Sequence, residues 1–209
     1  MKVRAKFFGA LSLSVLMVAL CIFQIQCTNM QEHKKSNEMT REEMIARGKY
    51  LVTVVGCNDC HTPKIFTALG PVPDTTKLLS GYPANSPLPQ MDTAAIHPGY
   101  WYLASPDLMA WVGPWGISYT ANITPDSSTG ISAWTEENFV GAIRTGKHLG
   151  MKGGRDILPP MPWNWMALMT DDDLKSIYQY LRTIPRISNQ VPAPVSPPDV
   201  IKLSSEKKT

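Results

Sequence analysis

The stretch Cys57-Asn58-Asp59-Cys60-His61 decides the fold, because it brings two thiols and an imidazole together in one short segment. This spacing is typical of the site that attaches a c-type haem. Each thiol adds to one vinyl group of the haem, and the adjacent imidazole binds the iron. We therefore predict one covalent haem c, held by Cys57 and Cys60, with His61 as the first axial ligand of its iron.

Two other interpretations of the paired cysteines are disfavoured. A zinc site needs a second pair of ligands, but Cys21 lies inside the N-terminal apolar run, Cys27 lies at its exit, and the other histidines are scattered. A thioredoxin-like redox pair needs a strand before the motif, whereas a helix is predicted there. Two cysteines also cannot form the disulfide scaffold of a small secreted protein.

Capping signals and apolar spacing predict three helices, at residues 40–55, 136–145 and 171–183. The first begins with a capping box, in which Thr40 is the N-cap and Glu43 reaches back to it. A glycine or a proline soon follows each helix and ends it. The haem motif therefore comes directly after the first predicted helix.

The segments between and after these helices show no sustained period. Residues 62–133 are rich in Pro, Gly, Ser and Thr, so we expect a long wrapping loop with short helical turns near 75–79 and 106–112. Residues 147–166 are irregular as well. Residues 185–209 are rich in proline and are predicted to form an extended tail.

Met161 is the candidate for the second axial ligand of the iron. It lies in Pro159-Pro160-Met161-Pro162, where three prolines fix the backbone and remove the donors that would draw the segment into a helix or strand. A weak thioether ligand needs such a fixed backbone. Met166 and Met169 are expected to be core residues, and His97 and His148 are the remaining alternatives as ligands.

The N-terminus predicts export. Lys2, Arg4 and Lys6 precede an uncharged apolar run, Phe7 to Ile25, which is typical of a signal segment. Residues 1–26 are thus an export signal or membrane anchor, and 27–39 a polar linker. Three outcomes stay open: lipidation at Cys27, an uncleaved membrane helix, or free export to the periplasmic side.

The rest of the chain has the composition of one globular domain. Of the 209 residues, 44% are hydrophobic and 18% charged, which excludes a disordered chain. The net charge of +3 equals that of the three N-terminal cations, so the body is neutral. A neutral body without clusters of basic residues lacks the positively charged surface that a nucleic-acid-binding protein uses.

These features together resemble a class I cytochrome c domain. More narrowly, several segments resemble the cytochrome domains of electron-transfer subunits of bacterial membrane-bound alcohol and sugar-acid dehydrogenases. The segments that carry this resemblance are Asn122 to Asp126, Thr129 to Ile131, Trp134-Thr135, Ala142 to Gly146 and Pro160 to Trp163. The resemblance covers residues 40–184. It implies an all-α, cytochrome c-like fold, with few helices around one covalent haem and long irregular loops.

The resemblance also implies roles for further residues. In class I cytochromes a Gly-Pro soon after the haem histidine supplies the carbonyl that accepts the imidazole Nδ1 proton, and Gly70-Pro71 is similarly placed. A tryptophan before the penultimate helix donates its indole N–H to a haem propionate, as Trp134 would here. The first and last helices are expected to cross with Gly48 against Tyr178 or Leu181.

Together these expectations describe an exported carrier of single electrons rather than an enzyme. A haem with His61 and Met161 both bound leaves no open position for substrate. A dehydrogenase, a quinol-oxidising complex or a terminal oxidase would be the redox partner. The alternatives are a five-coordinate haem enzyme or gas sensor, in which Met161 only packs, and a structural anchor subunit whose haem is incidental.

Overall fold

The computed structural model describes residues 38–206. The chain divides into two units at Thr40, and the fold described below is that of the second unit, which begins at Arg41. The predicted export segment at 1–26 and Cys27 lie outside the described residues. Within residues 38–206, no helix combines the length and the apolar character needed to cross a bilayer.

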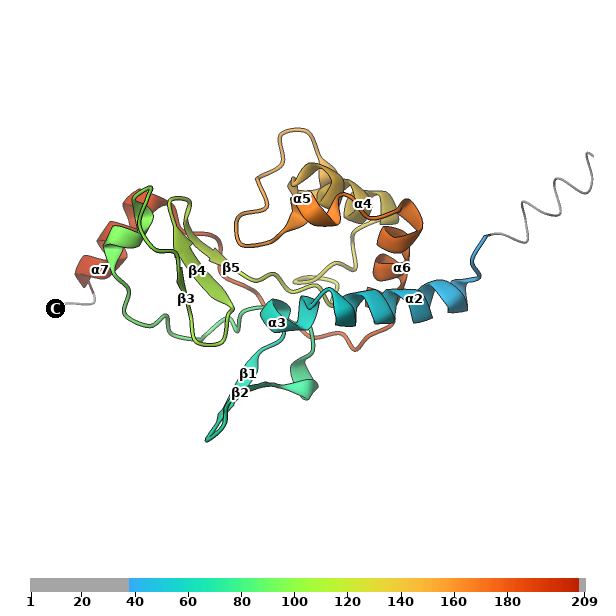
Figure 1. The fold of residues 1–209 in the computed structure, drawn as a ribbon, viewed down its shortest axis with the longest axis horizontal. Coiled ribbons are helices and arrows are strands. Elements are labelled where there is room, and N and C mark those ends of the chain that lie inside the picture. The colour runs from blue at the N-terminus through green and yellow to red at the C-terminus, as the bar shows by residue number, and fades with distance from the viewer. Residues whose placement is uncertain (1–37, 207–209) are drawn as a thin grey trace, which may run out of the picture. The chain divides into compact units, whose positions relative to one another are not determined.

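The haem motif forms a short helix of its own. Helix α2 spans Arg41–Val54, which confirms the helix predicted over residues 40–55. Gly56 then takes a left-handed conformation with φ of 77°, a conformation that favours glycine. It turns the chain directly into helix α3, Cys57–His61 (Figure 1).

The other two predicted helices are confirmed as well. Helix α4 spans Glu136–Thr145 and begins with a capping box between Thr135 and Asn138. Helix α6 spans Asp171–Leu181, and the Thr170 hydroxyl accepts the N–H of Asp173 at its start. These hydroxyl caps explain why both starts were predictable from sequence. A short helix, α5 (Trp163–Met166), lies between them in the chain.

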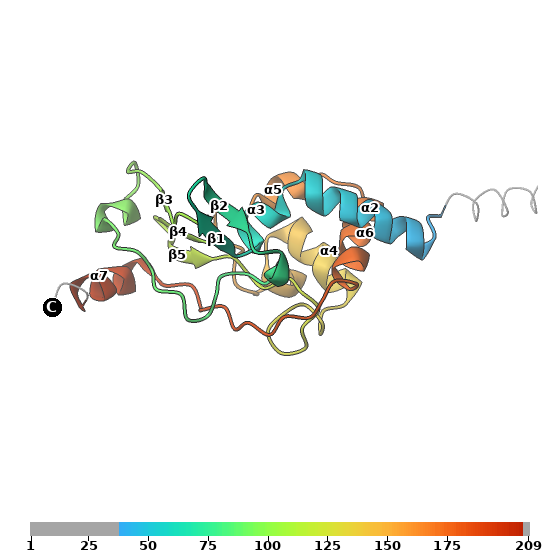
Figure 2. The same ribbon diagram turned by 90° about the horizontal axis from the view of Figure 1, so that it is seen from below.

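Helices α2 and α6 pack against each other at Gly48 (Figures 1 and 2). A Cβ at this position would lie 1.9 Å from the Ser176 carbonyl oxygen and 2.8 Å from the Tyr180 Cβ. The predicted crossing is therefore present, but its partner residues are not Tyr178 and Leu181. Those two side chains are buried in the core instead, because they lie on the apolar face of α6.

One main hydrophobic core lies beneath these helices. Its buried members come from α2, α4, α5, α6 and two loops: Leu51, Val52, Leu79, Ile131, Phe139, Ile143, Met166, Leu174, Ile177, Tyr178 and Leu181. Several half-buried side chains border this main core, among them Cys57, Trp134 and Met161. Three residues named from the sequence as site residues thus border the same core.

Residues 62–133 are more ordered than predicted, because they contain two small antiparallel sheets. Strands β1 (Lys64–Thr67) and β2 (Gly70–Pro73) form a hairpin. Strands β3 (Leu103–Ala104), β4 (Ala110–Gly113) and β5 (Gly116–Tyr119) form the second sheet. Two short 3-10 helices, Thr75–Lys77 and Thr93–Ile96, interrupt the segment. The fold is mostly helical with two small sheets, which corrects the prediction of an all-α protein.

The two helical turns predicted within this segment have different outcomes. The turn predicted near 75–79 is confirmed by the 3-10 helix Thr75–Lys77. The turn predicted near 106–112 is wrong, because Leu108 adopts a φ of 61° and the Ser105 hydroxyl accepts the N–H of Ala110. That turn feeds strand β4 rather than a helix.

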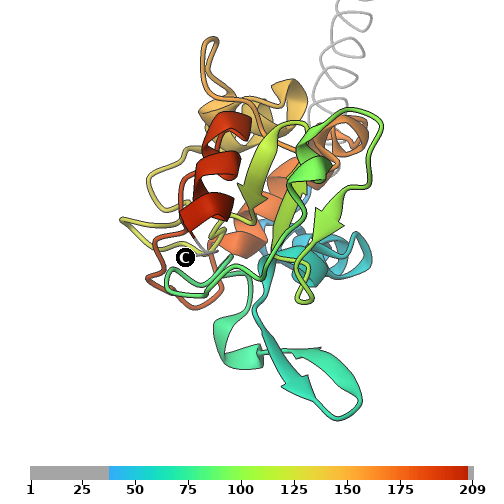
Figure 3. The same cartoon turned by 90° about the vertical axis from the view of Figure 1, so that its left-hand side faces the viewer.

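The predicted extended tail is wrong beyond residue 196. Val195 bridges to Ile117 of β5, and helix α7 (Pro197–Glu206) follows. The Ser196 carbonyl accepts the N–H of Val200, and prolines are tolerated in the first turn of a helix. Figure 3 shows α7 beside the second sheet, where it completes a second core of Ala95, Ile96, Val112, Ile117 and Val200.

Substitution of Gly48 tests the close approach of α2 and α6. Gly48→Ala adds a methyl group that overlaps the Ser176 carbonyl. Overpacking costs roughly 1–3 kcal/mol, and alanine returns up to about 1 kcal/mol of helix propensity. Because the obstacle is backbone, we expect chemical denaturation to show a net loss of about 2 kcal/mol. Lys49→Ala, on the exposed side of α2, should stay within about 0.5 kcal/mol of the parent. Equal stability of both variants would contradict the contact.

Candidate haem-attachment site

Helix α3 presents the two thiols on one face. Cys57 and Cys60 are three residues apart in a helix, so their side chains lie one turn from each other, and both are free thiols. Burial raises the pKa of Cys57 to about 11 and also raises the pKa of Cys60. Before a haem is attached, both groups would therefore be protonated thiols at neutral pH.

The His61 imidazole is buried and oriented by one hydrogen bond. Its Nδ1 lies 2.8 Å from the Ala121 carbonyl oxygen, which can only accept, so Nδ1 carries the proton. The lone pair of Nε2 is then free to bind a metal. Burial lowers the pKa of His61, which keeps the ring neutral as a ligand must be.

The acceptor at His61 is not the one predicted. Gly70-Pro71 was expected to supply the carbonyl, but these residues lie at the start of β2, where Thr67 pairs with Gly70. Pro71 is exposed on the hairpin. The chain after His61 continues outward into β1 instead of folding back over the ring, so a carbonyl from beyond β5 takes this place. Ala121 replaces Pro71 in this role.

Lys64 is a contributor that the sequence analysis missed. Its Nζ donates to the carbonyl oxygens of Asn58 (3.3 Å), Asp59 (3.0 Å) and Thr62. These carbonyls lie at the C-terminal end of α3, where a cation is favoured by the helix dipole. Burial lowers the pKa of Lys64. A lysine just after the motif was a visible signal for this cap.

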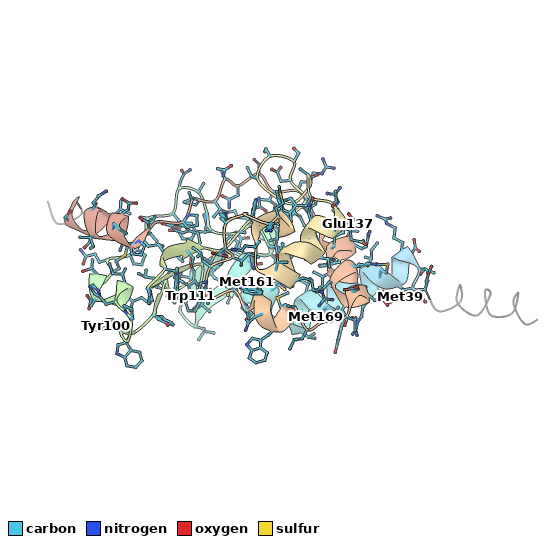
Figure 4. The ribbon with its side chains drawn as sticks, turned by 90° about the horizontal axis from the view of Figure 1, so that it is seen from above. Met39, Tyr100, Trp111, Glu137, Met161 and Met169 are labelled. Carbon is cyan, nitrogen blue, oxygen red and sulfur yellow. The ribbon has the colours of Figure 1, made fainter. Side chains whose placement is uncertain are left out.

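The methionines differ in how deeply their side chains are buried. Met161 is half-buried at the border of the main core, as is Met169 (Figure 4). Met166 is 7% exposed and is part of the core, as predicted. Met151 is 57% exposed, whereas Met109 is fully buried in another cluster. Met161 thus stays the candidate ligand, with Met169 as the residue to test against it.

Trp134 contacts His148, one of the two alternative ligands, whereas His97, the other, is exposed. Trp134 borders the main core, its carbonyl accepts the Tyr178 hydroxyl at 2.8 Å, and its ring meets that of His148 edge-on at 5.1 Å. The role of its indole N–H as a donor to a haem propionate stays a prediction. His97 is exposed at the end of a 3-10 helix.

The residues present fit a covalently bound haem. Two thiols one turn apart and a neutral imidazole with Nε2 free are the donor set that haem c requires. Beside Ala121, the Thr120 hydroxyl is buried with no partner, which is costly unless a further acceptor is present. Among the residues that the structure describes, no group of three or more His, Cys, Asp and Glu side chains forms a metal cluster.

Asn122 holds the segment that carries the Ala121 carbonyl. Its Nδ2 donates to the Ile187 carbonyl at 2.8 Å, and its Oδ1 accepts from the N–H and the hydroxyl of Thr124 at 3.0 and 2.7 Å. The residue is only 5% exposed. Sequence reasoning recognised this segment through its resemblance but assigned no role to the amide.

The fold and the donor set of α3 are similar to those of a cytochrome c domain, and comparison with known proteins points to the same class. No protein-family model matches the chain. The chain is 26% identical over 145 residues to the gluconate 2-dehydrogenase cytochrome c subunit of Pantoea cypripedii. This match covers 69% of the chain and 24% of that protein. It is 29% identical over 158 residues to the fructose dehydrogenase cytochrome subunit of Gluconobacter japonicus. This match covers 73% of the chain and 25% of that protein.

A third relative extends the pattern. The chain is 28% identical over 139 residues to the alcohol dehydrogenase (quinone) cytochrome c subunit of Gluconobacter oxydans, with 66% of this chain and 21% of that protein covered. The chain thus spans about a quarter of the length of these relatives. It resembles the cytochrome c domains of dehydrogenase subunits, which confirms the resemblance inferred from its motifs.

Removal of the Asn122 amide tests whether it holds the site. Asn122→Ala leaves the buried Thr124 N–H without its partner, and the Ile187 carbonyl keeps only the longer bond from the Thr124 hydroxyl at 3.3 Å. A buried group left unpaired costs about 1–3 kcal/mol. We expect urea denaturation to show a total loss of about 2–4 kcal/mol. Asn164→Ala, at an exposed position, should change stability by less than about 0.5 kcal/mol. Identical transitions for the two variants would contradict the role of Asn122.

Proposed function

We propose that the chain is an electron-transfer cytochrome that carries one haem c on Cys57 and Cys60, with His61 and Met161 as the axial ligands. The observation that carries this proposal is helix α3, where two thiols share a face and the neighbouring imidazole is oriented with Nε2 free. When bound, the haem iron supplies a couple that gains and loses one electron.

The protein's own groups have four tasks in this function. Cys57 and Cys60 hold the group covalently, so it cannot dissociate between electron transfers. The Ala121 carbonyl keeps the Nδ1 proton on His61, which raises the basicity of the ligand. Met161 supplies a soft sulfur that favours the reduced state. Trp134 would donate its indole N–H to a propionate of the haem, and the Thr120 hydroxyl, which is buried without a partner, is a further candidate donor.

A haem with both axial positions filled favours electron transfer over oxygen or peroxide chemistry. The alternative is a five-coordinate haem enzyme or gas sensor, in which Met161 serves only to pack. Carbon monoxide separates the two functions, because it should bind poorly to a reduced iron that already holds His61 and Met161. Rapid, tight binding would favour the alternative.

The names of the relatives support a dehydrogenase as the electron donor, because each is a cytochrome subunit of one. A quinol-oxidising complex or a terminal oxidase is the proposed partner on the other side. The N-terminal signal features support an exported protein on the periplasmic side of the membrane, tethered through Cys27 or the apolar run. The chain itself then transforms no substrate and acts as a subunit or carrier. The rival proposal is a structural anchor subunit whose haem is incidental. It predicts that the redox partner turns over equally fast with and without this chain.

Covalent attachment gives the first test of this function. Haem should stay with the polypeptide through acid-organic extraction and denaturing electrophoresis, since thioether bonds survive both. The double variant Cys57→Ala/Cys60→Ala should lose all haem under the same treatment. Haem that is extracted from the parent protein would contradict the proposal.

Methionine ligation gives the second test. Met161→Ala should keep its haem but lose the weak absorption band at ~695 nm that marks a sulfur ligand, and its midpoint potential should fall by on the order of 0.1 V. Met166→Ala should keep the band and lose ~2–5 kcal/mol of stability, because that side chain only packs. Met169→Ala is the decisive control. If this variant loses the band and Met161→Ala keeps it, the ligand is Met169.

A further inference from the structure

The prolines around Met161 restrict the local backbone angles, but they cannot anchor the segment to the rest of the protein. Pro159, Pro160 and Pro162 have no N–H groups, so the segment joins the rest of the protein largely through its carbonyl oxygens. On the C-terminal side, the Pro162 carbonyl accepts the N–H groups of Trp165 and Met166 at 3.1 Å each, which starts α5. On the N-terminal side, the attachment comes from another element.

That attachment is the Ser118 hydroxyl, on strand β5. It donates to the Pro159 carbonyl oxygen at 2.6 Å, two residues before Met161. It also accepts the indole N–H of Trp115 at 3.2 Å. The hydroxyl can make both hydrogen bonds at once, because it accepts one and donates the other, and each bond strengthens the other by polarisation. Ser118 is 6% exposed, so little water competes for the Pro159 carbonyl.

The chain just beyond β5 reaches the other predicted axial ligand, three residues after Ser118. The Ala121 carbonyl holds the Nδ1 proton of His61 at 2.8 Å. The backbone between these points is itself paired, because the Thr120 N–H donates to the Met109 carbonyl at 3.0 Å. Residues 118–121 therefore contact the His61 side and the Met161 side through one rigid piece of chain.

We propose that Ser118 is a positioning residue for the Met161 sulfur, and that residues 118–121 set the separation between the two axial ligands. The inference rests on the proposed His61 and Met161 ligation. The hydroxyl holds the Pro159 carbonyl, and with it the loop, so that the thioether would reach a haem iron without first having to order its backbone.

The test uses the oxidised, haem-bound full chain and imidazole as a competing ligand. Imidazole binds only when Met161 leaves the iron, so its affinity reports how firmly the loop is held. Loss of one buried hydrogen bond in Ser118→Ala should tighten imidazole binding about tenfold and weaken the ~695 nm band. Ser118→Thr keeps the hydroxyl and should keep the affinity of the parent.

Two further variants separate positioning from general loosening. Ser105→Ala removes another buried hydroxyl of the same sheet, one that caps the turn before β4 and makes no bond to Pro159. It should lower stability but leave imidazole affinity unchanged. Trp115→Phe removes the bond to Ser118 but keeps an aromatic ring beside Tyr102, and it should have an intermediate effect.

The outcomes are distinct. Unchanged imidazole affinity and an intact band in Ser118→Ala would overturn the role of Ser118 while leaving the proposed ligands in place. Equal tightening in Ser118→Ala and Ser105→Ala would also overturn it, because the effect would then follow stability alone. A parent protein with no sulfur-to-iron band would contradict the proposed ligation and this inference together.

Discussion

The close contact of α2 with α6 at Gly48 is the constraint on which the site depends. No side chain separates the two helices there, so their backbones fix each other within the main core. Helix α3 follows α2 after one left-handed glycine, which carries the position of α2 directly to Cys57. On the other side, α6 follows α5 in the chain, and the Met161 loop leads into α5 (Figure 1).

The chemistry of the site rests on backbone carbonyls more than on charged side chains. His61 is oriented by the Ala121 carbonyl, α3 is capped through carbonyls by Lys64, and the Met161 loop is held at the Pro159 carbonyl. The bonds at His61 and Pro159 join uncharged groups, whereas Lys64 brings one positive charge to α3. Burial and a nearby cation would both oppose the extra positive charge of a ferric iron, which favours the reduced state.

The helices and the haem motif could be predicted from the sequence because their signals are local. Thr135 and Thr170 are N-caps that precede apolar stripes, and Cys57 to His61 is a contiguous motif. The strands were missed because they are two to four residues long, too short to show an alternating pattern. Helix α7 had a local signal in Ser196-Pro197-Pro198-Asp199, but the prolines were interpreted as extended chain.

The contacts within the site were harder to predict, for a physical reason. A backbone carbonyl has no residue type, so nothing in the sequence marks Ala121 rather than Gly70 as the acceptor for His61. The choice depends on where β5 ends in space. Ser118 is similar, because its partner Pro159 is 41 residues away along the chain. Long-range hydrogen bonds of this kind follow from the assembled fold and not from a motif.

NMR spectroscopy of the reduced, haem-bound protein with labelled methionine methyl groups tests the central claim most directly. A methyl group whose sulfur binds the iron lies over the haem ring, and the ring current shifts its proton resonance far upfield of the other methionines. Of the eleven methionines, one resonance should be shifted in this way, and it should vanish only in Met161→Leu. A spectrum with no upfield methyl resonance, or one that persists in Met161→Leu, would contradict ligation by His61 and Met161.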